Sequence, residues 1–341
     1  MRIAYDVTPL SHPRTGVGNY ILGALKGMLE APGQKHEIVA FGPVSIRGRT
    51  LLDETLDGLP VEKRLFTVPF AHATRRAWGA LGRPLAETFI GNFDVLHFSD
   101  WMIPPQRAGV RATMIHDLGP LRFPERLYPR TVNMHSATAR EAQTCDVVFA
   151  NSSYTANDVI DRLGLRPERV HVAYPGVDGR FRPHGERHDH GRPYVFTTAT
   201  EDWRKNRRVV ELAVGLLGDE LALAALGHEG LGYPSDEKLA ALYRGAAVFA
   251  YPSRFEGFGM PVVEAMACGV PCVVSSHTSL DEACGDAAVR ADPDSPEEFA
   301  EGIRRALADR DELVTRGLDQ ARRFSWLETG RIHLQSYADA L

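Results

Sequence analysis

Short apolar runs that alternate with longer amphipathic stretches constrain the fold of this 341-residue chain more than any other feature. In the first half, the runs lie at residues 3–5, 37–41, 95–98, 113–115, 147–150 and 170–173. Apolar runs this short are typical of strands that are buried on both faces, and the stretches between them are typical of helices. The pattern predicts an α/β chain whose mostly parallel sheets are covered by helices.

A single interruption of this alternation predicts two domains. Residues 179–192 are rich in charge, Gly and Pro, as interdomain linkers are. The apolar runs then resume at residues 194–198, 221–226, 248–251 and 271–274. Because the chain is longer than one hydrophobic core usually serves, we expect Rossmann-like domains at residues 1–178 and 193–325. Ser325 with Glu328 is a capping pattern that predicts a C-terminal helix at about 326–341, which packs back on the first domain.

Composition excludes several classes of protein. The net charge of −5 offers no general attraction for nucleic acid, which binds through clustered Lys and Arg. The four cysteines are too scattered for a disulfide scaffold or a zinc site. The N-terminus reaches Asp6 too early for a signal peptide, and no apolar run is long enough to span a membrane. We therefore expect a cytoplasmic protein that binds no nucleic acid and no metal ion.

The segment from Glu256 to Glu264 carries the densest chemical signal. It follows an apolar run and opens a predicted helix, and Pro261 suits the first helical positions. We expect the backbone amides from Gly257 to Val262 to point outward, toward phosphate or hydroxyl oxygens. Two carboxylates eight positions apart can flank one ligand and accept the hydroxyl hydrogen bonds that sugars and riboses offer. The alternative is a solvated loop Glu followed by a first-turn Glu that the helix dipole favours.

This motif resembles the E-x7-E signature of the retaining glycosyltransferases of family 4, which adopt the GT-B fold of two Rossmann-like domains facing across a cleft. The resemblance implies that Glu256 contacts the donor sugar and that Glu264 binds the ribose hydroxyls. It implies that the glycine loop binds the donor as well, through Gly257, Phe258, Gly259 and Met260. Further similar stretches, at residues 151–155, 170–178 and 281–288, extend the resemblance over nearly the whole chain.

Arg204 and Lys205 are the predicted ligands of the donor's diphosphate, because a negative leaving group needs fixed cations. In the family a Lys at the place of Lys205 does this work. Many members have a second basic residue just upstream, but residues 198–203 of this chain contain none. Either Arg204 assists Lys205, or fewer cations hold the phosphates. The alternative is a basic first helical turn on the surface.

In the first domain the candidate residues are Gly16, Gly18 and His116. Gly16 and Gly18 resemble the N-terminal glycine loop that faces the donor phosphates in the family. Ile21 replaces the third glycine of a dinucleotide fingerprint, which argues against a dehydrogenase. His116 follows an apolar run, so it lies at the carboxyl edge of the predicted sheet, where ligands bind in doubly wound folds. The family has a His there, close to the transferred sugar, whereas a core histidine is the alternative.

These features predict a hexosyltransferase that moves a sugar, with mannose favoured, from a GDP- or UDP-sugar to a hydroxyl of a glycan, lipid or small-molecule acceptor. The resemblance implies a same-face displacement that needs neither metal nor cofactor, with His116, Lys205 and Glu256 as catalytic residues. Two alternatives stay open. One is an inactive partner subunit that binds the nucleotide sugar, and the other is an epimerase or phosphorylase on the same architecture.

Two further segments bear on its partners. A group of basic and aromatic residues lies among apolar ones: Arg75, Arg76, Trp78 and Arg83. As an alternative to a free cytoplasmic protein, this group favours peripheral contact with the inner face of an anionic membrane. The connection from Gly227 to Lys238 is shorter than relatives usually have, which predicts altered recognition of the nucleotide base. The sequence leaves the acceptor, the donor base and the oligomeric state open.

Overall fold

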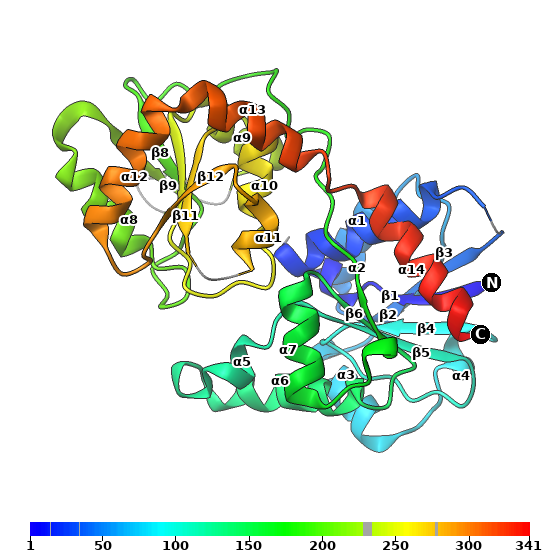
Figure 1. Cartoon of the computed structure of the whole chain (residues 1–341). Coiled ribbons are helices and arrows are strands. Elements are labelled where there is room, and N and C mark those ends of the chain that lie inside the picture. The colour runs from blue at the N-terminus through cyan, green and yellow to red at the C-terminus, as the bar shows by residue number, and fades with distance from the viewer. Residues whose placement is uncertain (14, 34, 228–233, 277–278) are drawn as a thin grey trace. The chain divides into compact units, whose positions relative to one another are not determined.

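The computed structural model describes residues 1–13, 15–33, 35–227, 234–276 and 279–341 (Figure 1). It divides into two compact units, of which the first comprises Met1–Gly176 with Trp326–Leu341 and the second comprises Val177–Ser325. Each unit is built on one sheet of parallel strands that helices cover. The predicted α/β class and the two Rossmann-like domains are confirmed.

The first sheet has the strand order β3-β2-β1-β4-β5-β6-β7. Its strands are β1 (Arg2–Asp6), β2 (Glu37–Val44), β3 (Glu62–Thr67), β4 (Val95–Phe98), β5 (Val110–Ile115), β6 (Val147–Ala150) and β7 (Val170–Val172). The helices of this unit are α1 (Gly16–Glu30), α2 (Ile46–Thr55), α3 (Ala71–Leu81), α4 (Glu87–Ile90), α5 (Gly119–Arg122), α6 (Pro129–Ala142), α7 (Ser153–Leu163) and α14 (Trp326–Ala340), with 3-10 turns at Thr8–Ser11, Pro124–Arg126 and Pro167–Arg169.

Successive residues of the central strands supply opposite faces of this sheet, because side chains alternate along a strand. In β1, Ile3 and Tyr5 join the core under α1, α2 and α14, while Ala4 joins a second core with Trp78 of α3. In β6, Val148 likewise faces away from its neighbours and packs in a third cluster with α6 and α7. Burial on both faces explains why these strands appear as unbroken apolar runs.

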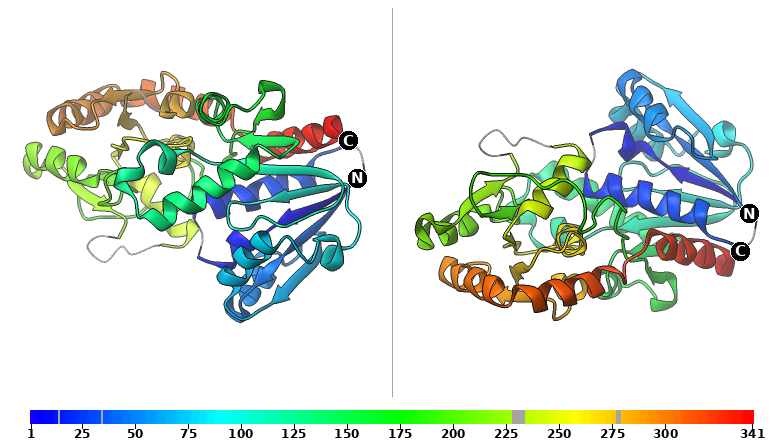
Figure 2. Two further views of the ribbon diagram at one scale, coloured as in Figure 1. Left: turned by 90° about the horizontal axis from the view of Figure 1, so that it is seen from below. Right: turned by 90° about the horizontal axis from the view of Figure 1, so that it is seen from above.

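The C-terminal helix α14 packs against α1, as Figure 2 shows and as predicted for residues 326–341. The two backbones approach closely, since a Cβ atom on Gly27 would lie 1.8 Å from the carbonyl oxygen of Trp326. Buried hydrogen bonds add to this contact. Tyr337 Oη pairs with Nδ1 of His97 at 2.7 Å and with Nδ1 of His333 at 3.0 Å.

The second sheet has the strand order β12-β11-β10-β8-β9. Its strands are β8 (Tyr194–Thr197), β9 (Ala222–Ala225), β10 (Val248–Tyr251), β11 (Cys272–Ser275) and β12 (Ala288–Ala291). The helices are α8 (Arg207–Leu216), α9 (Asp236–Gly245), α10 (Met260–Ala267), α11 (Leu280–Cys284), α12 (Pro296–Ala308) and α13 (Arg310–Ala321), with a 3-10 turn at Gly218–Glu220. A core of aliphatic side chains joins the strands to α8 and α12.

Three expectations differ from the structure. Residues 179–192, expected as a linker, belong to the second unit, because the His188 N–H donates to the Ala241 carbonyl of α9 at 2.9 Å. Glu264 is the fifth residue of α10 and so lies beyond its first turn. In α3, Arg75 and Trp78 are only 2% and 7% exposed, so the expected membrane contact through these two side chains is wrong. Trp78 packs inward because it fills the core beneath β1 and β2.

None of the helices within the described ranges is long and apolar enough to cross a membrane. The expectation of a cytoplasmic protein stays a prediction.

Candidate active site

The strand order of the second sheet places one crevice at its carboxyl edge. From β8 the chain goes to β9 on one side, then returns to β10 on the other side of β8. Loops that leave two neighbouring strands in opposite directions make a topological switch point, where ligands of such sheets bind. The loop after β8 contains Arg204 and Lys205, and the loop after β10 contains Glu256. The sheet thus brings together residues more than fifty positions apart in sequence.

A backbone hydrogen bond joins these two loops. The Arg204 carbonyl accepts the Arg254 N–H at 2.8 Å. Within the first loop, the Asp202 carboxylate accepts the N–H groups of Arg204 and Lys205 at 3.0 and 3.1 Å. Asn206 follows in the left-handed conformation (φ 56°), which Asn tolerates better than most residues. The position of the Lys205 backbone is therefore fixed from both sides.

The half-buried Lys205 and the buried Glu256 form an ion pair, with 2.6 Å between Nζ and Oε1. The same Glu256 oxygen accepts hydrogen bonds from the Ser253 hydroxyl at 2.6 Å and from the Tyr251 hydroxyl at 3.0 Å. Arg204 Nη1 lies 3.9 Å from the other carboxylate oxygen. Glu256 is only 6% exposed, so the alternative of a solvated loop Glu does not hold.

The protonation state of this cluster follows from its contacts. Burial raises the pKa of Glu256, but the charges of Lys205 and Arg204 and the hydrogen bonds from Lys205 and Ser253 outweigh it, so the pKa lies below its usual value. Burial and the nearby Glu256 charge raise the pKa of Tyr251 well above its usual value. Glu256 is therefore an anion that Tyr251 serves as a hydrogen-bond donor, next to two cations.

The start of α10 borders this cluster. Gly259 caps the helix with φ 110°, and a Cβ atom there would lie 2.3 Å from Leu280 Cδ2, so both the backbone and the packing require glycine. The outward array of amides predicted from Gly257 to Val262 is narrower than expected. Pro261 has no N–H, and the Val262 N–H donates to the Gly259 carbonyl at 3.0 Å.

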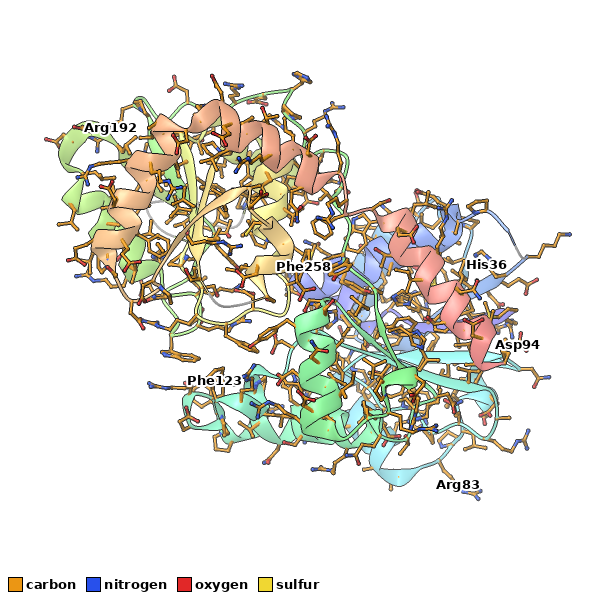
Figure 3. All side chains as sticks on the ribbon, in the orientation of Figure 1. His36, Arg83, Asp94, Phe123, Arg192 and Phe258 are labelled. Carbon is orange, nitrogen blue, oxygen red and sulfur yellow. The ribbon has the colours of Figure 1, made fainter. Side chains whose placement is uncertain are left out.

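The predicted donor-binding residues of the glycine loop divide by how their side chains lie. Phe258, labelled in Figure 3, packs its ring edge-on against Phe324 with 5.0 Å between centroids. Its side chain therefore belongs to the core, and only its backbone can serve a ligand. Met260 at the helix start is half-buried.

Glu264 has a partner of its own. The Tyr243 hydroxyl, from α9, donates to Oε2 of Glu264 at 3.1 Å. Burial raises the pKa of Glu264 to about 7, which the hydrogen bond from Tyr243 only partly offsets. Near neutral pH the carboxyl group can thus either accept or donate a hydrogen bond, as a ligand for vicinal hydroxyls would.

In the first unit, the structure brings the start of α1 and the end of β5 to one cavity of about 80 Å³. Val17, between the predicted Gly16 and Gly18, lines it together with His116. Gly16 is exposed and a Cβ atom there would contact nothing within 4 Å, so local packing does not require this glycine. Burial lowers the pKa of His116 to about 4, so its imidazole is neutral at physiological pH. The Tyr20 ring meets it edge-on at 5.2 Å.

Two family models match this chain. The model described as Glycosyltransferase Family 4 matches residues 14–180, and the model described as Glycosyl transferases group 1 matches residues 223–324. The chain belongs to glycosyltransferase family 4. The predicted family and the predicted class of enzyme are confirmed.

Individual relatives agree with this assignment. The glycosyltransferase is 26% identical over 382 residues to the O-antigen chain mannosyltransferase B of Escherichia coli, and the alignment covers 96% of each chain. Among solved structures it resembles a sucrose-phosphate synthase from Thermosynechococcus elongatus, with a TM-score of 0.73, 16% identity and coverage of 99% and 98%. It also resembles Anabaena HepE in complex with UDP-glucose, with a TM-score of 0.71, 15% identity and coverage of 99% and 100%. These likenesses support the GT-B fold, while the cleft expected between its domains stays a prediction.

Sequence reasoning missed three residues of the enzyme's candidate site. Tyr251 and Ser253 hold Glu256, and Tyr243 holds Glu264. Tyr251 ends a strand and Ser253 lies three positions before Glu256, so their place at the carboxyl edge of the sheet was a usable signal. Tyr243 had none, because only the packing of α9 against α10 brings it to Glu264. The roles assigned to the site residues stay predictions.

Proposed function

We propose that the enzyme transfers a hexose, with mannose favoured, from a GDP- or UDP-sugar to an acceptor hydroxyl, with retention of the anomeric configuration and without a metal ion. The proposal rests on the cluster of Arg204, Lys205 and Glu256 at the switch point of the second sheet. Two cations and one carboxylate leave a net positive charge, which suits a diphosphate. The carboxylate oxygens suit sugar hydroxyls.

Such a transfer breaks the bond between the anomeric carbon and a phosphate oxygen, so negative charge grows on the departing nucleoside diphosphate. In the proposal, Lys205 and Arg204 stabilise that charge, and Glu256 orients the sugar. The acceptor oxygen attacks from the face that the phosphate leaves, and its proton passes to the departing phosphate oxygen. Charges and protons then balance without a side-chain base.

Relatives support the choice of donor. The mannose preference rests on the likeness to the mannosyltransferase of Escherichia coli. UDP is an equal candidate because the similar HepE was solved with UDP-glucose. The shortened connection predicted to alter base recognition contains residues 228–233, which lie outside the described residues.

His116 contributes from the first unit in this scheme. A neutral imidazole can donate one hydrogen bond and accept another, which suits the hydroxyls of the transferred sugar better than acid–base chemistry does. Gly16 is exposed and leaves room for the donor phosphates, whereas Gly18 is buried, with the Leu10 side chain 3.6 Å from where its Cβ atom would lie.

A thermal-shift screen tests the proposal. A ligand at a hundred times its dissociation constant adds about 2.7 kcal/mol to stability, so we expect GDP or UDP, and the matching sugar nucleotide, to raise the melting temperature. The anomeric proton coupling of the product then reports retention, and assays with and without a chelator report metal dependence. The proposal fails if no nucleoside diphosphate stabilises the protein.

A further inference from the structure

The first unit contains a second and larger cavity, of about 590 Å³, between α3, the loop after β4, and α6. Ligand pockets of proteins typically have about 300–1,000 Å³. Its lining includes His72, Arg75, Asp100, Trp101, Met134 and Arg140. The roles assigned above use none of these residues.

Arg75 is the most informative residue of this lining. It is 2% exposed, and within the described part of the chain its Nε and Nη1 atoms are buried without a hydrogen-bond partner. The charge that acts on it most is Asp6, whose carboxylate accepts hydrogen bonds from the Thr8 N–H at 2.8 Å and from the Ser99 hydroxyl. A buried cation with unused donors is costly unless a ligand supplies an anion.

The Arg75 side chain is held in place from one side. Its Cζ atom lies 5.4 Å from the centre of the Trp101 ring, a cation–π contact. Burial and the Arg75 charge lower the pKa of His72 and of His12, so these imidazoles are neutral near pH 7. Of the two, His72 lines the cavity; it does not add to the charge there, yet it stays available as a hydrogen-bonding group.

Asp100 connects this cavity to the one that contains His116, since it lines both. Its Oδ1 atom is buried and has no hydrogen-bond partner within the described residues. Burial and the nearby Asp6 charge raise the pKa of Asp100 to about 7. A carboxyl group in this position suits a hydroxyl of a ligand that extends from the Arg75 cavity toward His116.

The remaining charges of the lining favour an anion. Arg76 and Arg140 line the cavity and are exposed. The Glu141 carboxylate also belongs to the lining, but Arg111 forms an ion pair with it. The uncompensated charge at the cavity is therefore positive.

We propose that this cavity is the acceptor site and that it binds the phosphate group of a phosphorylated acceptor. Arg75 is its buried ligand, and Asp100 accepts a hydrogen bond from an acceptor hydroxyl other than the one that receives the sugar. The planar guanidinium matches the oxygens of a phosphate by paired hydrogen bonds. The inference rests on the proposed function, because it names the class of acceptor for that transfer. The phosphate has two sources, a soluble sugar phosphate or the phosphate of a lipid-linked acceptor.

Direct binding to the full chain tests the proposal. Calorimetric titration uses mannose 6-phosphate as the soluble probe, an isoprenyl phosphate in detergent micelles as the lipid probe, and unphosphorylated mannose and empty micelles as blanks. We expect one phosphate probe to bind and its blank to be at least tenfold weaker. Binding of the soluble probe identifies a soluble acceptor, and binding of the micellar probe identifies a lipid-linked one. If neither phosphate probe binds better than its blank, the inference is wrong.

Variants locate the binding. Arg75→Gln should weaken the phosphate probe at least tenfold, whereas Arg83→Gln removes the same charge from an exposed position outside the lining, visible in Figure 3, and should leave it unchanged. Should Arg75→Gln fail to fold, Ala77→Trp fills the cavity from an exposed lining position and should block the probe as strongly. Full affinity in Arg75→Gln or in Ala77→Trp overturns the inference.

Nucleotide binding separates this inference from the proposed function. Arg75 belongs to the first unit and Lys205 to the second. We expect both cavity variants to bind the nucleoside diphosphate as the unaltered enzyme does. If the phosphate probes bind but no nucleoside diphosphate does, the proposed function fails while the phosphate site stands. If a nucleoside diphosphate binds but no phosphate probe does, the phosphate site fails while the proposed function stands.

Discussion

The two units differ in whether the buried polar groups of their candidate sites have hydrogen-bond and charge partners. In the second unit, Glu256 receives an ammonium and two hydroxyl donors. In the described part of the first unit, Arg75 and Asp100 keep buried atoms without a partner. The Glu256 carboxylate thus has its partners before any ligand binds, whereas Arg75 and Asp100 have donor and acceptor atoms that a ligand could pair.

This difference affects the free energies of folding and of ligand binding in each unit. A preformed cluster keeps its groups in place and loses little entropy when a ligand binds. Buried unpaired groups lower stability by about 1–3 kcal/mol each until a ligand pairs them. We infer that the donor-side cluster acts through preorganisation, and that the cavity of the first unit gains specificity because a ligand without the matching charge leaves Arg75 unpaired.

Removal of Lys205 tests the preformed cluster and should have the largest effect. Lys205→Ala should lower the transfer rate about a thousandfold, because the leaving group loses its closest cation. It should also destabilise the second unit by about 3 kcal/mol, since it leaves the Glu256 charge buried beside weaker partners. Steady-state kinetics and denaturant unfolding measure the two effects.

The double variant Lys205→Met with Glu256→Gln distinguishes these effects. It removes both charges, so the stability should return to near that of the unaltered enzyme while the activity stays lost. Recovery of activity together with stability would show that Lys205 has only a structural role.

Glycine substitutions compare the glycine loop before α10 with the one at the start of α1. Gly259→Ala should cost about 2–4 kcal/mol, because Ala is strained at φ 110° and its Cβ meets Leu280. Gly16→Ala meets no atom within 4 Å and should change the stability by less than about 0.5 kcal/mol. A weaker donor affinity in Gly16→Ala with an unchanged melting temperature would indicate that a ligand needs this space. An unchanged affinity would remove Gly16 from the predicted donor site.

Most strands were predictable from sequence, whereas the edge strand β3 was not. The run at residues 147–150 coincides with β6, which is buried on both faces. β3 went unpredicted, and it lies at one edge of its sheet, although the edge strands β7 and β9 coincide with predicted runs. β3 reads Glu-Lys-Arg-Leu-Phe-Thr, and charged side chains on an edge strand hide its periodicity while they discourage pairing with other chains. The edge strand β7 is only half-buried yet was predicted, so the charged residues of β3, and not its edge position, hid it.

Some residues of the candidate sites were likewise predictable from sequence, and others were not. Arg204, Lys205 and Glu256 follow apolar runs, so their place at a sheet edge was predictable. The unpaired state of Arg75 was not, because its neighbours in sequence suggested an exposed basic helix. Only the packing of α3 against the sheet, with Trp78 in the core, turns Arg75 inward. Side chains whose role depends on helix rotation need the tertiary structure.

His116 offers an intermediate effect that belongs to the first unit. His116→Ala should lower kcat/KM about a hundredfold and leave nucleoside diphosphate affinity unchanged, because its partner in the proposal is the sugar. Since burial lowers the pKa of His116 to about 4, its titration should not appear in the rate profile between pH 5.5 and 8. A rate step at about pH 6.5 that disappears in His116→Ala would contradict an imidazole that is neutral at that pH.

An effect that depends on pH is expected at Glu264, where one buried carboxyl group of the second unit departs from the well-paired cluster beside it. Its pKa of about 7 lies above the usual value of 4.5, so the folded state binds the proton more tightly than the unfolded state does. This contribution to stability is therefore fully present below about pH 4.5 and is lost as the pH rises through 7. Glu264→Gln removes the ionisation, so the variant should match the unaltered enzyme near pH 4.5 and exceed its stability at pH 8 by roughly 3 kcal/mol. Glu301→Gln, on the exposed surface of α12, is the matched control and should show no such pH dependence.

If Glu264 also binds the ribose, the more stable variant should bind nucleoside diphosphate more weakly at pH 8. A gain in stability without that loss would separate Glu264 from the donor and leave it a buried acid with Tyr243 as its partner.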